Sequence, residues 1–135
     1  MSYTIDVIGG GSIGESGFLG VLGAAGAERN PDEWTSGQWQ DGDKTVWFFY
    51  DPDFPTPGHL EDHGAELTEA LGEPPGFLVS LQVSRTPGSE EFAVRFIAAM
   101  AAKYGIVVRG QRELLRPAEV AERWAHHRDR LGVFG

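Results

Sequence analysis

Alternation of apolar and polar residues predicts two long strands. In residues 3–8, Tyr3, Ile5 and Val7 share one face, and residues 77–84 carry apolar side chains at every odd position. Successive side chains of a strand point to opposite faces of its sheet. Each segment is therefore predicted to be a strand with one buried face and one face that is at least partly wet.

Two shorter segments are also predicted to be strands. Residues 38–40 and 45–50 lie on either side of Asp41-Gly42. Asp-Gly accepts the positive φ angles of a tight turn, so the sequence predicts a hairpin closed by a type I′ turn. The apolar run at residues 106–108 predicts one more short strand.

Helical spacing of apolar residues predicts four helices, within residues 18–25, 59–71, 89–104 and 117–131. The first of these lies in a segment that has a glycine at every third position from residue 11 to residue 26. An interior glycine weakens a helix by ~1 kcal/mol relative to alanine. We expect the missing side chains to let this helix pack close against a sheet.

The predicted order of elements is β-α-β-β-α-β-α-β-α. A hairpin and two strands with a polar face favour an antiparallel sheet over a parallel one, which is buried on both faces. We therefore expect an α+β fold, with a mostly antiparallel sheet of about five strands and helices packed mainly on one face. Without a linker or a charge tract, residues 1–135 are predicted to form a single domain.

The composition supports a folded, intracellular protein. Hydrophobic residues make up 41% of the chain, and 8 Phe, 4 Trp and 3 Tyr supply large side chains for a core. Cysteine is absent, which excludes disulfides and thiolate chemistry. No basic residue precedes Arg29, and the uncharged segment 16–27 is too short to span a bilayer. We expect a cytoplasmic protein that does not bind membranes.

Residues 5–14 match the first part of a dinucleotide-binding fingerprint, I-x-V-x-G-x-G-x-x-G. Glycines let the backbone approach a pyrophosphate, which a helix N-terminus attracts. The fingerprint also needs a second strand that ends in an acidic residue about 20 residues later. Residues 27–33 contain no apolar run to form that strand. We therefore predict no nucleotide cofactor and interpret the glycines as a tightly packed turn and helix, while anion binding by Gly9–Gly14 stays open.

A candidate metal site is formed by Asp51, Asp53, His59 and His63. The two histidines are four residues apart on a predicted helix, so both can reach one ion. The segment lacks the glutamate that directly follows the first histidine in zincin metalloproteases. No metal is predicted, although a site for a divalent ion remains an alternative.

Tyr104, Arg109 and Arg112 are a possible anion-binding group near the C-terminal third of the chain. The run from Arg109 to Arg112 is more simply interpreted as a charged turn. His127, on the apolar face of the last predicted helix, is expected at the edge of the core.

Negative charge is concentrated in residues 1–84, and aromatic residues cluster with acids between Trp34 and Phe54. The net charge is −9; residues 1–84 carry −12 and residues 85–135 carry +3. The run Trp47-Phe48-Phe49-Tyr50 cannot enter one core if it is a strand, because its side chains alternate between two faces. Either helices cover both faces, or one aromatic pair lies on the surface, where aromatic residues ringed by acids would resemble a protein-binding hot spot.

The stretch from Pro87–Phe92 through Gly105–Val108 to Leu115–Val120, about a quarter of the chain, resembles the C-terminal halves of immunity proteins from bacterial toxin systems. That resemblance implies an inhibitor that covers the cationic active site of a toxin. Acidity itself argues against nucleic acid and for a basic protein partner. A metal-dependent or nucleotide-using enzyme and a structural or oligomerising domain are the alternatives.

The hypothesis of a protein-binding module assigns roles to six residues in the acidic and aromatic part of the chain. We expect four carboxylates to steer a basic partner and two indole rings to anchor it. These residues are Asp41, Asp43, Asp51, Asp53, Trp39 and Trp47.

Overall fold

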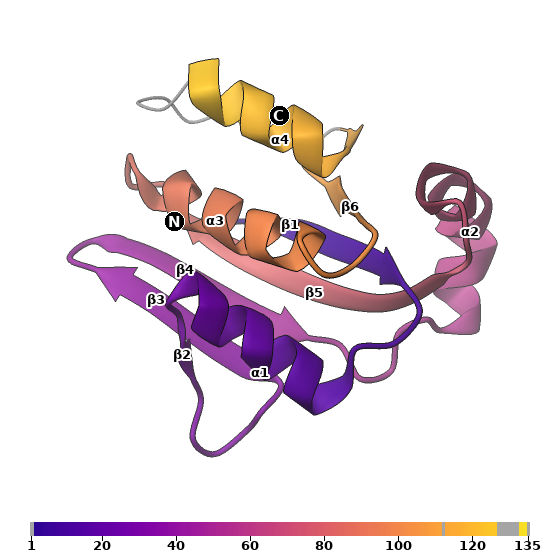
Figure 1. The fold of residues 1–135 in the computed structure, drawn as a ribbon, viewed down its shortest axis with the longest axis horizontal. Coiled ribbons are helices and arrows are strands. Elements are labelled where there is room, and N and C mark those ends of the chain that lie inside the picture. The colour runs from indigo at the N-terminus through magenta and orange to yellow at the C-terminus, as the bar shows by residue number, and fades with distance from the viewer. Residues whose placement is uncertain (1, 112, 127–132, 135) are drawn as a thin grey trace.

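A computed structural model describes residues 2–111, 113–126 and 133–134, without the side chains of His59 and Asp62. These residues form one antiparallel sheet of seven strands and four helices, shown in Figure 1. The strands are β1 (Ser2–Gly10), β2 (Glu28–Arg29), β3 (Ser36–Asp41), β4 (Lys44–Tyr50), β5 (Pro75–Ser84), β6 (Ile106–Arg109) and β7 (Leu114–Leu115). The helices are α1 (Gly14–Ala25), α2 (Pro57–Leu71), α3 (Ser89–Ala101) and α4 (Pro117–His126).

The strand order across the sheet is β2-β3-β4-β5-β1-β6-β7. Strand β1 lies near the middle, between β5 and β6, and both of these neighbours run antiparallel to it. The α+β class and the antiparallel sheet are thus confirmed. The expected number of about five strands is too small, because β2 and β7 add two strands of two residues each.

Helices α1, α3 and α4 cover one face of the sheet and lie side by side across it (Figure 1). The odd-numbered residues of β1 and the even-numbered residues of β4 point toward these helices. Those of β1 are buried, as are Val46 and Phe48 of β4, whereas Lys44 and Tyr50 are half-buried. The buried residues meet Phe18 of α1, Phe92 and Phe96 of α3, and Val120 of α4 in the main core.

Helix α2 packs on the opposite face of the sheet, at the end where β1 and β5 approach their turns (Figure 1). Leu67 of α2 and Phe54 of the preceding loop meet Ile8, Leu78 and Val107 in a second, smaller core. The expectation that helices pack mainly on one face therefore holds for three of the four helices of the described chain. We use the term open face for the side of the sheet opposite α1, α3 and α4, in the part that α2 leaves uncovered.

The turn between β3 and β4 differs from the expected type. Its two central residues are Gly42 and Asp43, because Asp41 pairs with Lys44. Gly42 has a φ of 62°, whereas Asp43 has a negative φ. A positive φ at the first central position alone is the pattern of a type II′ turn, so the predicted type I′ turn is wrong.

The glycines of the N-terminal segment act in a different way from the expected one. Gly20 and Gly23 lie on the exposed side of α1, where an added Cβ would meet no described atom within 4 Å. Close packing occurs at the strand ends: a Cβ on Gly9 would lie 2.2 Å from the ring of Phe77, and one on Gly76 would lie 1.8 Å from the carbonyl oxygen of Gly11. These glycines let two chain segments touch.

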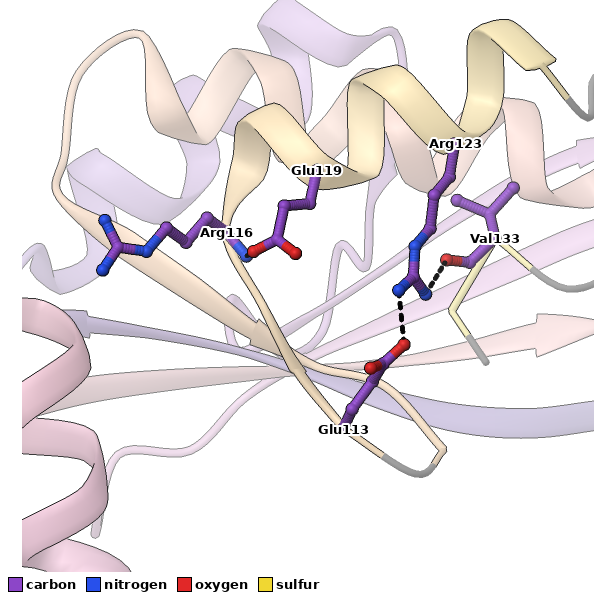
Figure 2. Close-up of polar contacts among 5 residues, drawn as sticks. All are labelled: Glu113, Arg116, Glu119, Arg123 and Val133. Atoms are coloured by element: carbon purple, nitrogen blue, oxygen red, sulfur yellow. Dashed lines mark hydrogen bonds and ion pairs between the residues drawn. The ribbon is translucent and has the colours of Figure 1, made fainter.

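Helix α4 begins with one half of a capping box. The backbone N–H of Arg116 donates to the side chain of Glu119 at 3.0 Å, as in a capping box (Figure 2). Val120 is buried and Trp124 packs against the main core, as the spacing predicts. The residues expected to continue this face, His127 and Leu131, lie outside the described residues. None of the described helices is long and apolar enough to cross a membrane.

Candidate functional site

The open face carries two aromatic residues of β4, and one of them, Phe49, is the most exposed aromatic residue of the described strands. Phe49 is 41% exposed and Trp47 is half-buried. Their cross-strand partners on β3 are Ser36 and Gln38, and their partners on β5 are Ser80 and Gln82. The open face therefore combines two large rings with amide and hydroxyl groups, which can form hydrogen bonds with a bound molecule.

The alternation of β4 explains why these two rings are exposed. Phe48 is fully buried and packs against Phe92 and Phe96, with ring centroids 5.9 and 4.7 Å apart. Tyr50 also turns to the helix-covered side, where its ring lies 5.6 Å from that of Phe18. Of the two arrangements considered for the aromatic run, the structure has the one with an aromatic pair on the surface.

A hollow of about 380 Å³ adjoins this pair at the edge of the sheet. Its lining residues are Glu28, Arg29, Asn30, Pro31, Ser36, Gly37, Gln38, Trp47 and Phe49. The loop on its outer side is held by Asn30, whose side chain donates to Ser36 at 3.1 Å and accepts from the N–H of Asp32 at 2.9 Å. The hollow thus has an ordered wall, and its size is in the range that a protruding side chain of a partner can fill.

The four candidate carboxylates lie beyond the two ends of β4, and by the alternation of β3 the side chain of Asp41 points to the helix-covered side. Asp41 and Asp43 are exposed at the β3–β4 turn, and Asp53 is exposed in the loop after β4. Asp51 is half-buried, and its carboxylate accepts the N–H of Asp53 at 2.9 Å. At about 3.3 Å per residue, the seven residues of β4 separate the two pairs by roughly 20 Å. The structure does not gather the acids into one cluster; it places one pair at each end.

Trp39 and Trp47 lie on opposite faces of the sheet. Trp39 pairs with Val46, on the helix-covered side, and its ring stacks on Phe92 with centroids 4.4 Å apart. Its packing gives Trp39 a structural role, so the two expected anchors do not share one flat surface. The neighbour of Trp47 on the open face is Phe49, two residues along β4, which the sequence reasoning did not select.

The candidate metal ligands are only partly described. His63 is exposed on α2, and the side chain of His59 lies outside the described part of the structure. Within the described residues, no group of three or more His, Asp or Glu side chains is placed to hold a metal ion. The glycine segment also lacks the parallel βαβ unit of a dinucleotide site, because both neighbours of β1 run antiparallel to it.

The candidate anion-binding group is divided by the sheet. Tyr104 packs on the helix-covered side, where its ring lies 5.9 Å from that of Phe77. Arg109, at the end of β6, pairs with Asp6 and faces α2. Arg112 lies outside the described residues. Tyr104 and Arg109 therefore cannot hold the same anion.

A buried polar network fixes the start of α3 beneath the β3–β4 hairpin. The hydroxyl of Tyr3 donates to the carboxylate of Glu90, which is 2% exposed. The hydroxyls of Ser84 and Ser89 are 2.5 Å apart, and Ser84 also accepts the backbone N–H of Thr45 at 3.1 Å. Burial raises the pKa of Tyr3 far above its ordinary value, and the hydrogen bond to Glu90 and the charge of that carboxylate raise the pKa further. This network is interior and stabilises the fold.

Comparison of the chain with protein-family models, with curated proteins and with solved structures found no match. The assignment of a function therefore depends on the geometry of the sites described above.

Proposed function

We propose that this chain is a protein-binding module that docks a basic protein on the open face of its sheet. The observation that carries the proposal is the pair of half-buried Trp47 and exposed Phe49 on that face, with acidic residues beyond both ends of β4. An immunity-type inhibitor that neutralises a basic toxin is the specific form of this function that we favour, on the resemblance of residues 87–120 to such proteins.

The aromatic pair would supply most of the affinity. Phe and Trp rings bury a large area at a small cost in side-chain entropy, and Trp is enriched among the residues that dominate binding energy. The neighbouring Gln38 and Gln82 are exposed and can donate or accept hydrogen bonds at the rim. A central apolar contact surrounded by polar groups is the usual arrangement of a protein interface.

The carboxylates would act mainly on the rate of association. Asp43 and Asp53 are exposed at opposite ends of β4, and the whole chain carries a net charge of −9. Charges at an interface rim steer the encounter of oppositely charged proteins and add little once the complex has formed, because solvent screens them. A basic partner is therefore expected to bind faster at low salt than at high salt.

The experiment measures association and dissociation by biolayer interferometry with the protein encoded beside this gene, provided that it is basic. Trp47→Ser and Phe49→Ser should each raise the dissociation rate by about tenfold or more, as loss of an interface anchor does. Leu60→Ser is the matched control, because Leu60 is 45% exposed but lies on α2. Equal dissociation rates for Phe49→Ser and Leu60→Ser would contradict the proposed surface.

Steering is tested with two double variants that change the net charge equally. Asp43→Lys with Asp53→Lys should lower the association rate by about tenfold at low salt. Glu15→Lys with Glu122→Lys places the same charge change on α1 and α4, on the helix-covered side. If both pairs slow association to the same extent, net charge alone acts and the acids at the ends of β4 have no directional role.

A further inference from the structure

A second hollow, of about 360 Å³, lies between α2 and the end of the sheet. It is distinct from the surface at Trp47 and Phe49. Its lining residues are Asp6, Ile8, Phe54, Thr56, Gly58, His63, Leu67, Leu78 and Arg109. The apolar members belong to the smaller core, and the polar members come from strands β1 and β6, from the loop before α2, and from α2 itself. The hollow therefore has an apolar floor and charged groups on its wall.

Arg109 has a buried nitrogen without a partner. Its Nη2 atom is inaccessible to solvent and forms no hydrogen bond within the described structure. The ion pairs found among residues 2–111, 113–126 and 133–134 are Arg95 with Glu91 and Arg123 with Glu113, so Arg109 takes part in neither. A guanidinium donor that has lost its water without gaining an acceptor is unfavourable. Arg109 as a whole is half-buried and lines the hollow, so an anionic group bound there can contact its guanidinium.

The fold holds the backbone next to Arg109 firmly. The N–H of Gly110 donates to the carbonyl of Glu113 at 2.8 Å, and the N–H of Gln111 donates to the carbonyl of Phe134 at 2.8 Å. Figure 2 shows Arg123 reaching from α4 to Glu113, at 2.5 Å, and to the carbonyl of Val133, at 3.4 Å. The β6–β7 turn is therefore tied to α4 and to the chain segment after it, which restricts the directions that Arg109 can take.

Asp6 stands directly across from Arg109 in the pairing of β1 with β6. Side chains at such positions have Cβ atoms about 5 Å apart. The Oδ1 atom of Asp6 accepts a hydrogen bond from the hydroxyl of Ser80 at 2.7 Å, which fixes the orientation of the carboxylate. A carboxylate and a guanidinium thus face the same hollow, side by side, without an ion pair between them.

We propose that this hollow binds a small α-amino acid with an apolar side chain. A ligand with only a carboxylate would satisfy Arg109 but would be repelled by Asp6, and a simple amine would have the reverse difficulty. In an α-amino acid the ammonium nitrogen and the carboxylate carbon are about 2.5 Å apart, because both bond to the same carbon. One such molecule can place its carboxylate on Arg109 and its ammonium group on Asp6.

The floor of the hollow selects the side chain. Ile8, Leu67, Leu78 and Phe54 present buried apolar surface there. An aliphatic or aromatic side chain would displace water from this surface, and the hollow is within the usual size range for small-molecule sites. A charged side chain would meet no counterpart on that floor. This site is independent of the proposed protein-binding surface and would stand if that proposal failed.

The experiment uses leucine as the probe, with two analogues that each lack one charge. We would titrate the whole chain with leucine, with 4-methylpentanoate and with 3-methylbutylamine, and follow backbone amide shifts by ¹H–¹⁵N NMR. Leucine should saturate shifts at Asp6 and Arg109, and each analogue should bind at least about tenfold more weakly. Binding of either analogue as tightly as leucine would overturn the paired recognition, and absence of saturation by leucine would overturn the site.

Two variants separate recognition from a merely structural role. Arg109→Gln should weaken the binding of leucine by at least about tenfold. The affinity for 3-methylbutylamine should stay unchanged or increase, because the variant no longer repels the ammonium group. Asp6→Asn should weaken the binding of leucine to a similar extent, and the affinity for 4-methylpentanoate should stay unchanged or increase. Arg95→Gln, an exposed arginine of α3, is the matched control and should not change leucine affinity. If both Arg109→Gln and Asp6→Asn weaken the binding of all three ligands to the same extent, the proposed roles are wrong. Circular dichroism confirms that each variant is folded.

Discussion

Replacement of Tyr3 by phenylalanine tests the buried polar network at the start of α3. Tyr3 is 7% exposed, and its hydroxyl donates to the carboxylate of Glu90. Tyr3→Phe keeps the ring and removes only the donor. Loss of a hydrogen bond to a buried, charged acceptor costs about 1–3 kcal/mol of unfolding free energy. At pH 8 we therefore expect the variant to be less stable than the wild type by roughly that amount.

The difference in stability between the wild type and Tyr3→Phe should decrease as pH rises. Burial, followed by the hydrogen bond to Glu90 and its charge, raises the pKa of Tyr3 in the folded state, whereas the unfolded chain keeps the ordinary value near 10. Above about pH 10 the unfolded state loses the phenolic proton and the folded state retains it, so the wild type loses stability as pH rises. The stabilisation is fully present below the pKa that Tyr3 has in the unfolded chain. Between pH 10 and pH 11 the wild type loses about 1 kcal/mol of unfolding free energy.

Urea denaturation followed by tryptophan fluorescence measures both unfolding free energies at a series of pH values. The wild type should approach Tyr3→Phe in stability as pH rises from 9 to 11, because the variant lacks the ionising hydroxyl. Subtraction of the two curves cancels the titration of the groups that they share. A gap that stays constant from pH 8 to pH 11 would show that Tyr3 ionises in the folded protein as readily as in the unfolded chain.

Two further predictions compare matched substitutions. Phe48→Ala should lower the unfolding free energy by about 3–5 kcal/mol, because Phe48 is fully buried, whereas Phe49→Ala should change it by less than about 1 kcal/mol. Equal losses of unfolding free energy, measured by urea denaturation, would contradict the assigned faces of β4. Gly110→Ala should destabilise the folded protein by about 2 kcal/mol or more, since the new Cβ would lie 2.1 Å from the carbonyl oxygen of Phe134. Gly20→Ala, in open space on α1, should leave the stability unchanged or raise it slightly. Similar melting temperatures for these two glycine variants would refute the packing argument.

The longer strands could be predicted because their alternation is a local property of the sequence. Residues 3–8, 77–84 and 106–108 lie within β1, β5 and β6, as predicted. Strands β2 and β7 could not be found in this way, since two residues contain no alternation. They exist because the chain on either side already aligns them with a neighbouring strand.

The side of the sheet that each helix covers was harder to predict. The leucines of α2 indicate an apolar stripe, yet Leu67 is buried whereas Leu60 is 45% exposed. Helical periodicity says that a face is buried and does not say against which side of a sheet it packs. The contact of Gly9 with Phe77 similarly joins residues far apart in the sequence, so the local glycine pattern did not reveal it.

The placement of Trp39 and Trp47 on opposite faces could have been predicted from the hairpin. A two-residue turn pairs odd positions of the first strand with even positions of the second, as Trp39 with Val46. Trp39 therefore shares a face with Phe48, and Trp47 shares one with Phe49. The pairing of Asp6 with Arg109, in contrast, joins residues from the two ends of the chain and carries no local signal.

The two proposed sites share one row of the sheet. Phe49 pairs with Ser80, Ser80 pairs with Asp6, and Asp6 pairs with Arg109, on the four adjacent strands β4, β5, β1 and β6. With about 4.8 Å between strands, the row is roughly 14 Å long. A protein interface of ordinary size, about 800 Å² on each partner, extends about 16 Å from its centre. A partner centred on Phe49 would therefore extend about as far as α2, which covers the Arg109 end of the row, and a leucine-sized ligand at Arg109 would not reach Phe49. Loss of partner binding and loss of leucine binding thus report on opposite ends of the same row.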